Sequence, residues 1–587
     1  MVRWGLVLSG VGLLPALWLT AQQNVPGIPA PVLRATTQLV QLDVVVTDKS
    51  GQPVRGLTRE DFVVEEKGKP QKIATFGFSQ HSAASHSGPP PLPENIYTNR
   101  VAYRTPTGPV TILMLDGLNT PIQNQAYARQ QLIQYLATQF KAGQRMAVFG
   151  LSNSLSVLQD FTSDPELLRA ALESAVAGKS SLLPDANRAP NTRTPAESSV
   201  RGGGAQFEKV LANVRQFQSE QDALALDTRV AVTLTALRTV ARAVAGYPGR
   251  KNLIWVSAAF PLVLTPDTGD GMNSIIPLSQ RAGFNTIRQY ADDIRRTSSY
   301  LSDAQVAVYP VDARGLVGAP LNDASSSGLN DAGLLRMGAD YGNQVAKQSG
   351  NLIETQFAMN AIAQETGGRA YFSRNDIDNA VALAVADGSV YYTLGYYVED
   401  KNWDGQFRGI SVKVDRPNVD VRHRPGYFAI DPVESYLKAK NKEKDNELAI
   451  AMRSDILPAT MVIFDSRVIP PDPAAKMTVP VEFLVNMQTI AVEPQSGGKQ
   501  HADLSFHAAA FSPEGKMVTA QDVRVDAPLK AETYQQFLQQ GLPFKLELEL
   551  APGRYQLRLA VRDNRTGYLG TMEVPLILAA SGNKSAR

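Results

Sequence analysis

A short apolar segment that ends on a carboxylate constrains the fold of this chain more than any other feature. Residues 110–115 read Val-Thr-Ile-Leu-Met-Leu, and a polar turn with Asp116, Asn119 and Thr120 follows directly. An apolar run of this length that stops at polar residues is typical of a central parallel strand, buried on both faces. Ligands of open α/β sheets bind at the carboxyl ends of such strands. We therefore expect a parallel sheet with a site around Asp116.

The region 109–388 has the strand-helix alternation of a parallel α/β domain. Two stretches rich in Pro, Gly, Ser or Asn interrupt it near 180–222 and 315–350, and both are predicted insertions. The apolar periodicity predicts helices near 123–140, 225–246, 284–301 and 352–365. Further strands are expected at 145–151, 252–257, 305–312 and 369–373.

Short β patterns occupy both sides of this region. Residues 36–80 supply about three or four alternating strands, and 389–430 supply about three more. Because sheets of so few strands are marginal alone, we expect the two segments to pair into one β-sandwich with the α/β domain inserted. The alternative is two separate small sheets packed on the α/β domain.

Two predicted linkers and a second β region complete the chain. Residues 81–108 are rich in Ser and Pro and are predicted to be a linker, and 431–456 a charged linker helix. Turns and short strands over 457–580 predict a separate C-terminal β-sandwich. A chain of 587 residues needs several such domains, since it is too long for a single core.

The amino terminus predicts an exported protein. Residues 1–21 have one cation, an apolar stretch and a small-residue end, which is typical of a cleaved signal peptide, and a Pro-rich linker follows over 22–35. The alternative is a retained anchor, but the apolar stretch is shorter than the roughly 20 residues of a spanning helix. We expect a periplasmic or extracellular protein with no membrane span after signal cleavage.

Composition excludes several classes of function. A net charge of +2 gives no reason to expect binding to nucleic acid. With 0 cysteines, thiol catalysis, disulfides and thiolate metal sites are excluded. No His-Glu-x-x-His motif occurs, and no Gly-x-Ser-x-Gly motif occurs after the predicted signal peptide. We expect a non-catalytic protein, and the weaker alternative is an enzyme or enzyme subunit with an unrecognised site.

Several motifs together resemble the von Willebrand factor A-related proteins of the acidobacterial type. They are "LVQLDVVVTDKSGQPVRGL", "LMLDGLNT", "QDFTSDPELLRAAL", "KNLIWVSAAFP", "VYPVDARGL", "IAQETGGRAYF" and "DGQFRGISVKVDRPNVDVRHRPGYF", and the resemblance covers about residues 36–428. It implies a Rossmann-like von Willebrand factor A domain. In that fold an Asp-x-Ser-x-Ser motif after the first strand holds a divalent cation that binds a partner's carboxylate.

The motif is altered here. Asp116 and Thr120 could still ligate Mg²⁺ or Ca²⁺, but Leu118 offers no oxygen where the family has a hydroxyl. Ser181 is the best match to the family's ligand from a later loop, and Ser257 stands where a further Asp is usual. The site is therefore predicted to be degenerate and to hold no cofactor, with a Mg²⁺ or Ca²⁺ site as the alternative.

These features predict an adhesion-type protein that binds another protein or a cell-envelope component. The alternative function is a metal-dependent adhesin in which Asp116 and Thr120 hold the cation. Asp312 is expected either to join the contact face or to pair internally with Arg314. Nothing in the sequence indicates the oligomeric state. The predicted ligand-binding face comprises Asp116, Asn119, Thr120, Ser181, Ser257 and Asp312.

Overall fold

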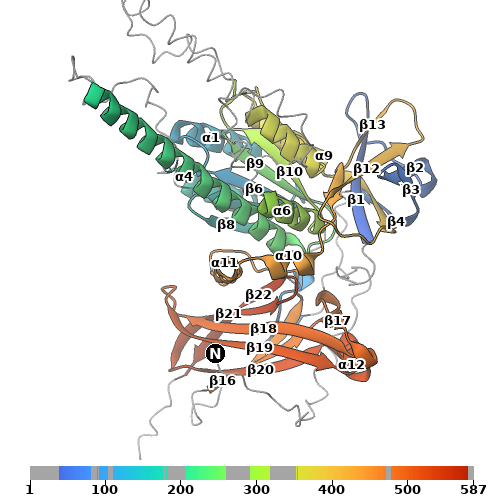
Figure 1. Cartoon of the computed structure of the whole chain (residues 1–587), viewed down its shortest axis with the longest axis vertical. Helices are drawn as coiled ribbons and strands as arrows, with labels where there is room; N and C mark the ends of the chain where they lie inside the picture. Colours follow the sequence, from blue (N-terminus) through green and yellow to red (C-terminus); the bar gives the residue numbers. More distant parts are fainter. Residues whose placement is uncertain are drawn as a thin grey trace, which may run out of the picture.

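The structure is a computed structural model that describes residues 39–80, 89, 91–103, 110–175, 180, 182, 205–259, 291–316, 352, 355–470 and 478–579. The predicted signal peptide, the 22–35 linker, Ser181 and most of the 315–350 insertion lie outside these residues. The described part is a mixed α/β protein with several sheets. Figure 1 shows an α/β unit flanked by two β units.

The central sheet of the α/β unit has the strand order β10-β9-β6-β7-β8. The register is parallel between β6 and both β7 and β9, and between β9 and β10, whereas β8 runs antiparallel to β7. Strand β6 lies in the middle and is almost completely buried, as its apolar sequence predicts. The strands are β6 (Val110–Asp116), β7 (Met146–Leu151), β8 (Leu155–Thr162), β9 (Lys251–Ser257) and β10 (Val306–Asp312).

Helices cover both faces of this sheet, which gives three layers. Leu113 points to one apolar cluster with α1 (Ile122–Thr138), α2 (Pro165–Ser174) and α9 (Ile377–Asp387). Its neighbours Ile112 and Met114 point to the opposite cluster with α4 (Ala205–Val244) and α6 (Ala291–Asp303). Alternate residues of β6 therefore face opposite layers. None of the described helices is both long and apolar enough to cross a membrane.

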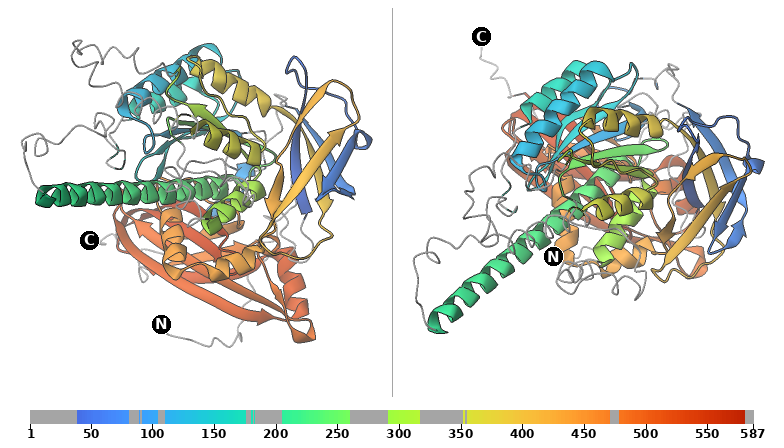
Figure 2. Two further views of the ribbon diagram at one scale, coloured as in Figure 1. Left: turned by 45° about the horizontal axis from the view of Figure 1, so that its top comes forward. Right: turned by 90° about the horizontal axis from the view of Figure 1, so that it is seen from above.

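Helix α4 is much longer than the sequence predicts. It begins at Ala205, so the prediction of an irregular insertion over 180–222 is wrong from 205 onward. Figure 2 shows its N-terminal half extending beyond the rest of the described molecule. Exposed Phe217 and Leu224 lie on this half. The first half of α4 is polar and has no continuous apolar face. It was not predicted, because the spacing of apolar residues is the main sequence signal for a helix.

The predicted strand 369–373 is wrong, because it shortens to one parallel bridge between Tyr371 and Val311. Tyr371 N donates to Pro310 O at 2.8 Å, and Asp312 N donates to Tyr371 O at 2.9 Å. Ser373 then adopts a φ of 56°, in the left-handed region. This conformation turns the chain away from β10 and ends the pairing.

The segments before and after the α/β unit pair with each other. Strand β1 lies between β11 and β13, and β12 lies between β2 and β14, so each sheet mixes strands from both segments. The two sheets have the orders β13-β1-β11-β4 and β14-β12-β2-β3, and Tyr392 packs at their interface against Phe62. The strands are β1 (Leu39–Asp48), β2 (Phe62–Glu66), β3 (Lys69–Gln71), β4 (Ile73–Gln80), β11 (Val390–Tyr397), β12 (Phe407–Val414), β13 (Val419–Arg422) and β14 (Gly426–Phe428).

The C-terminal unit has two packed sheets whose aromatic core includes stacked Phe506 and Phe544. One sheet contains β17 (Glu493–Pro494), β18 (Gln500–Phe511), β19 (Met517–Leu529), β21 (Gly553–Asp563) and β22 (Leu569–Leu578). The other contains β5 (Ile96–Thr98), β15 (Phe464–Val468), β16 (Thr478–Val485) and β20 (Leu542–Glu549), and α12 (Ala531–Gln540) precedes β20.

Strand β5 belongs to this unit although it precedes the α/β unit in the sequence. Thr98 pairs with Asp465, and its hydroxyl donates to the Asp465 carboxylate at 2.6 Å. The buried Asn99 amide donates to Val462 O at 2.8 Å. The prediction of a linker over 81–108 is therefore wrong for 91–103, since local composition carries no information about a partner strand that is more than 350 residues away.

Two short helices replace the predicted linker helix over 431–456. They are α10 (Pro432–Lys438) and α11 (Asn441–Ala451). Glu447 of α11 is 5% exposed and forms ion pairs with Arg242 (2.7 Å) and Arg238 (3.3 Å) of α4. A charged pattern normally predicts a solvated face, but here one carboxylate is buried between α11 and α4. This segment therefore fastens the units together.

Replacing Glu447 with Ala should lower the free energy of unfolding by about 3–5 kcal/mol, because buried Arg242 loses its carboxylate partner and buried Arg238 keeps only the longer pair with Asp293. Urea unfolding of the whole chain measures this loss. Glu443→Ala is the matched control one turn earlier in α11. Its ion pair with Arg296 is partly exposed, so the control should lose less than about 1 kcal/mol. Equal losses would show that Glu447 does not fasten the units.

Glu365 gives a second prediction. Burial raises its pKa to about 9 from an ordinary value of 4.5, and neither carboxylate oxygen has a hydrogen-bond partner among the described residues. The folded chain therefore binds more protons than the unfolded chain between these values, and stability falls as pH rises through that window. Glu365→Gln should abolish this loss, which is at most about 1.4 kcal/mol per pH unit. Parallel pH profiles of unfolding for this variant and for the wild type would contradict the prediction; exposed Glu549→Gln is the control.

Candidate functional site

Asp116 ends β6 at the carboxyl edge of the central sheet. Its side chain is only 2% exposed, so its charge depends on hydrogen bonds from the protein. Oδ1 accepts from the Asn119 backbone N–H at 2.9 Å. Oδ2 accepts from Asn119 Nδ2 at 2.9 Å, Trp255 Nε1 at 3.0 Å and Ser257 Oγ at 2.8 Å. Four donor groups therefore surround one carboxylate, although the single proton of Ser257 Oγ also has Ala259 O as an acceptor at 2.8 Å.

These donors come from two places that the fold brings together. Asn119 belongs to the turn after β6, whereas Trp255 and Ser257 project from the end of β9 toward the same edge. Because β6 and β9 are neighbouring parallel strands, their carboxyl ends meet at one edge of the sheet. Burial raises the pKa of Asp116, and the bonds from Asn119, Ser257 and Trp255 oppose that rise.

The altered motif residues have structural contacts. Leu118 is fully buried in the apolar cluster beneath α4 and does not reach the site. The Thr120 hydroxyl accepts from the Ala258 backbone N–H at 3.0 Å and ties the loop after β6 to the end of β9. Asp312 forms the internal pair with Arg314 that the sequence predicts, with Oδ2 2.7 Å from Nη2.

The structure brings the described residues of the predicted face to one edge but buries them. Asp116, Asn119, Thr120, Ser257 and Asp312 are each at most 2% exposed. They hold the loops in place and offer little surface to a partner. A surface that contacts a partner must therefore consist of other residues around them, which corrects the predicted face.

A second layer from α4 supports the site. Arg229 Nε donates to Asn119 Oδ1 at 2.8 Å, and Thr233 Oγ1 lies 3.4 Å from Asn119 Nδ2. Arg229 and Thr233 are one helical turn apart, so they share a face of α4. Burial lowers the pKa of Arg229, and the carboxylate of Asp116 opposes that fall.

The donor set does not fit a divalent cation. Mg²⁺ and Ca²⁺ require several oxygen ligands that direct lone pairs at the metal. N–H groups of Asn119 and Trp255 instead point at the Asp116 oxygens, and Leu118 supplies no oxygen. No cluster of three or more acidic or histidine side chains that could hold a metal exists in the described part of the chain.

A cavity opens beside this buried cluster. It has a volume of about 280 Å³ and reaches Asp116 and Thr120 from the side of β7, β8 and α1. Its wall is mixed, with apolar Leu115, Leu151 and Leu158 alongside polar groups. Besides Asp116 and Thr120, the polar side chains that line it are Gln125, Arg129, Ser152, Asn153, Ser156 and Ser180.

Most of these polar side chains are available for contact. Ser152 and Asn153 are exposed in the turn between β7 and β8, and Arg129 is half-buried on α1. Arg129 donates to Ala175 O at 2.5 Å, and it has no ion pair with any described residue. Gln125 donates to Thr120 O at 2.7 Å, so the cavity wall and the buried cluster are mechanically connected.

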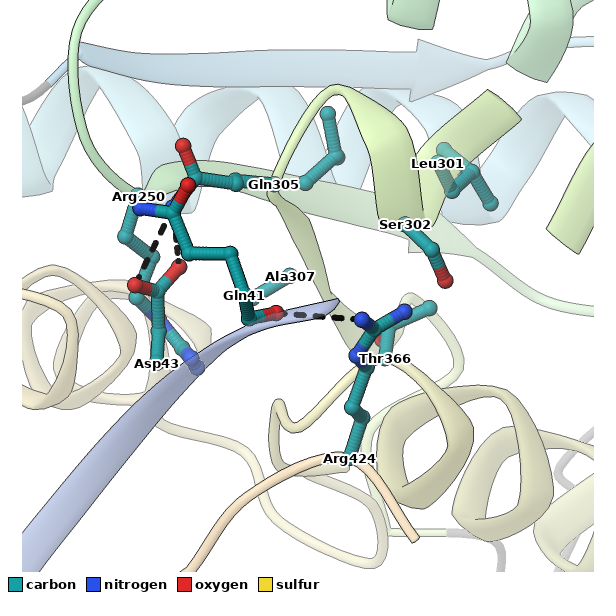
Figure 3. A pocket seen from close by; sticks show the side chains of 10 residues that line it. Gln41, Asp43, Arg250, Leu301, Ser302, Gln305, Ala307, Thr366 and Arg424 are labelled. Carbon is teal, nitrogen blue, oxygen red and sulfur yellow. Dashed lines mark hydrogen bonds between the residues drawn. The ribbon is translucent and has the colours of Figure 1, made fainter. Parts of the chain in front are cut away.

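A much smaller cavity lies between the β-sandwich and the α/β unit (Figure 3). Its volume of about 20 Å³ suits a single water molecule. Gln305 Nε2 lies 3.1 Å from both oxygens of half-buried Asp43, Thr393 donates to Asp43 at 3.0 Å, and Arg424 donates to Gln41 O at 3.0 Å. This polar junction joins two units and has no room for a ligand.

No family model matches the sequence, and no curated protein matches it. Distant similarities to solved structures exist. A von Willebrand factor type A protein from Catenulispora acidiphila is 9% identical, with 87% of this chain and 75% of that chain covered and a TM-score of 0.19. The pilus adhesin SpaC from Lactobacillus rhamnosus is 7% identical, with 90% and 59% covered and a TM-score of 0.25.

An aerotolerance-related membrane protein from Bacteroides fragilis is 12% identical. That alignment covers 48% of this chain and 98% of the other, with a TM-score of 0.23. A von Willebrand factor A protein is thus among the distant structural neighbours. TM-scores this low assign neither a family nor a function.

Sequence reasoning missed Arg229, Trp255 and the residues around the cavity. Arg229 precedes the apolar stripe of α4 by one position, and a sequence does not distinguish such a cation from a solvated one. Trp255 is in a predicted buried strand, where an aromatic residue indicates core packing alone. Ser152 and Asn153 belong to a polar turn, which is ordinary at the end of a strand.

Ser257→Ala tests the hydrogen-bond shell. Removing a buried donor to an ionised group should cost about 1.5–3 kcal/mol of unfolding free energy. Ser152→Ala is the control in the exposed turn and should change stability by less than about 0.5 kcal/mol. Urea denaturation of the three proteins measures both. A neutral Ser257→Ala would show that its hydroxyl does not sustain the Asp116 charge.

Proposed function

We propose that this chain is an exported, non-catalytic interaction protein of the von Willebrand factor A type. It binds another protein or a cell-envelope component at the carboxyl edge of its central sheet, without a cofactor. The contact surface is the rim of the 280 Å³ cavity, formed by Arg129, Ser152 and Asn153, with the buried Asp116 cluster beneath it.

The observation that carries this proposal is the position of the cavity. It lies at the carboxyl ends of parallel strands, where open α/β sheets bind their ligands. Its mixed apolar and polar wall suits recognition of a projecting side chain. Exposed Ser152 and Asn153 supply donors and acceptors at the mouth, and half-buried Arg129 supplies a cation.

Two other functions have less support. A metal-dependent adhesin requires free oxygen ligands, whereas the Asp116 oxygens accept four hydrogen bonds from protein groups. An enzyme requires a nucleophile or base with donors for a developing charge. No histidine is among the described residues that line the cavity, and the carboxylate of Asp116 accepts hydrogen bonds from structural donors.

A capture experiment from cell-envelope extract tests the proposal. Asn153→Arg narrows the mouth of the cavity. It should weaken binding of the partner that the wild-type chain captures by roughly tenfold, or about 1.4 kcal/mol of binding free energy, and reduce its recovery accordingly. Arg129→Ala should also reduce it. Gln521→Arg places the same side chain on exposed β19 and is the matched control, with recovery unchanged.

The same experiment with Mg²⁺ or EDTA separates the alternatives. Equal recovery in both is expected here, because no metal takes part. Recovery that requires Mg²⁺ and disappears in Asp116→Ala would favour the metal-dependent adhesin. Equal recovery by the wild type, Asn153→Arg and Arg129→Ala would exclude this cavity as the binding surface.

A further inference from the structure

A nearby cation would stabilise the buried Asp116 carboxylate in its charged form. The carboxylate is 2% exposed, and the side chains that donate to it, from Asn119, Trp255 and Ser257, are all neutral. Neutral donors reduce the cost of burying an ion, but a buried charge normally also has an opposite charge nearby. In a metal site, the cation would supply that charge.

Arg229 is positioned to supply this positive charge in place of a metal cation. Its side chain is 8% exposed, so its guanidinium is also removed from most of the solvent and benefits from an anion. Its Nε–H donates to Asn119 Oδ1 at 2.8 Å, and the amide of the same residue donates to Asp116 Oδ2 at 2.9 Å. One amide therefore links the two charges and is polarised by both, which strengthens each bond.

The geometry of α4 makes this placement specific. Thr233 lies one turn along the same face and places its hydroxyl 3.4 Å from the same amide nitrogen. The apolar residues Val230, Leu234 and Leu237 fasten this part of α4 to the sheet and are each at most 3% exposed. The packing of the helix thus fixes where the Arg229 side chain can reach.

We propose that Arg229 is the resident counter-ion of Asp116, so that a side chain of this protein occupies the electrostatic role of a divalent cation. Asn119 transmits the interaction between the two charges. The Asp116 carboxylate is then a structural anion that orders the loop after β6, and adding a divalent cation brings the site no benefit. This inference concerns the site itself and holds whether or not the cavity binds a partner.

Thermal unfolding of a set of variants tests the counter-ion role. Arg229→Met removes the charge and the donor, Arg229→Gln keeps an amide donor without charge, and Arg229→Lys keeps the charge. The melting temperature should fall by several degrees in the Met and Gln variants and should be largely restored by Lys. A Gln variant as stable as the wild type would overturn the proposal, since the hydrogen bond alone would then suffice.

A double-mutant cycle supplies an independent readout. Asp116→Asn removes the negative charge with little change in shape, so Arg229→Met should cost much less in that background than in the wild type. An unchanged cost would overturn the proposal. The comparison of Lys with Gln does not depend on Asp116→Asn, so it stands even if that variant fails to fold.

Metal addition completes the test. The melting temperature of the wild-type protein should be the same in millimolar Mg²⁺ or Ca²⁺ as in EDTA, because Arg229 already balances the charge of Asp116. A rise in the wild type that is absent in Asp116→Asn would show that a divalent cation binds at this carboxylate, and would overturn the counter-ion role of Arg229.

Discussion

The burial of one carboxylate, that of Asp116, organises the carboxyl edge of the central sheet. Asp116 ends the central strand of the central sheet, where solvent cannot stabilise its charge. Its oxygens accept hydrogen bonds from the turn after β6 and from the end of β9. Asn119 of that turn also accepts a hydrogen bond from Arg229 of α4, so three elements meet at this carboxylate. The same turn positions one wall of the nearby cavity, because the Gln125 side chain of α1 donates hydrogen bonds to the backbone of that turn.

Helix α4 extends this dependence to the C-terminal unit. One face of the helix contacts the Asp116 cluster through Arg229, and about two and a half to three and a half turns later Arg238 and Arg242 pair with Glu447 of α11. Thr460 of the C-terminal unit also bonds the backbone at the end of α4, with its N–H 2.9 Å from Arg242 O. The buried site and the contact between units are therefore attached to one rigid element.

The periodicity of apolar residues predicted those elements that depend on local sequence. The apolar runs predicted four strands of the central sheet, β6, β7, β9 and β10, and the position of Asp116 at the end of β6 followed from them. Non-local pairing was harder. Strand β5 joins a sheet built mainly by residues beyond 460, and α4 extends through a stretch without an apolar stripe. The charge partners of the site were equally hidden, since Arg229 and Asn119 are more than a hundred residues apart.

The altered residues of the motif are best understood as one electrostatic change. A cation site needs lone pairs directed at an empty centre, whereas a buried carboxylate needs protons directed at its oxygens. Leu118 removes a hydroxyl from the site and fills the core, Ser257 presents a donor, and Trp255 adds an indole N–H. Leu118 and Ser257 reduce the number of acceptors, and Ser257 and Trp255 supply donors. Together with the guanidinium of Arg229, they make a shell that stabilises an anion, and the same shell disfavours a metal ion.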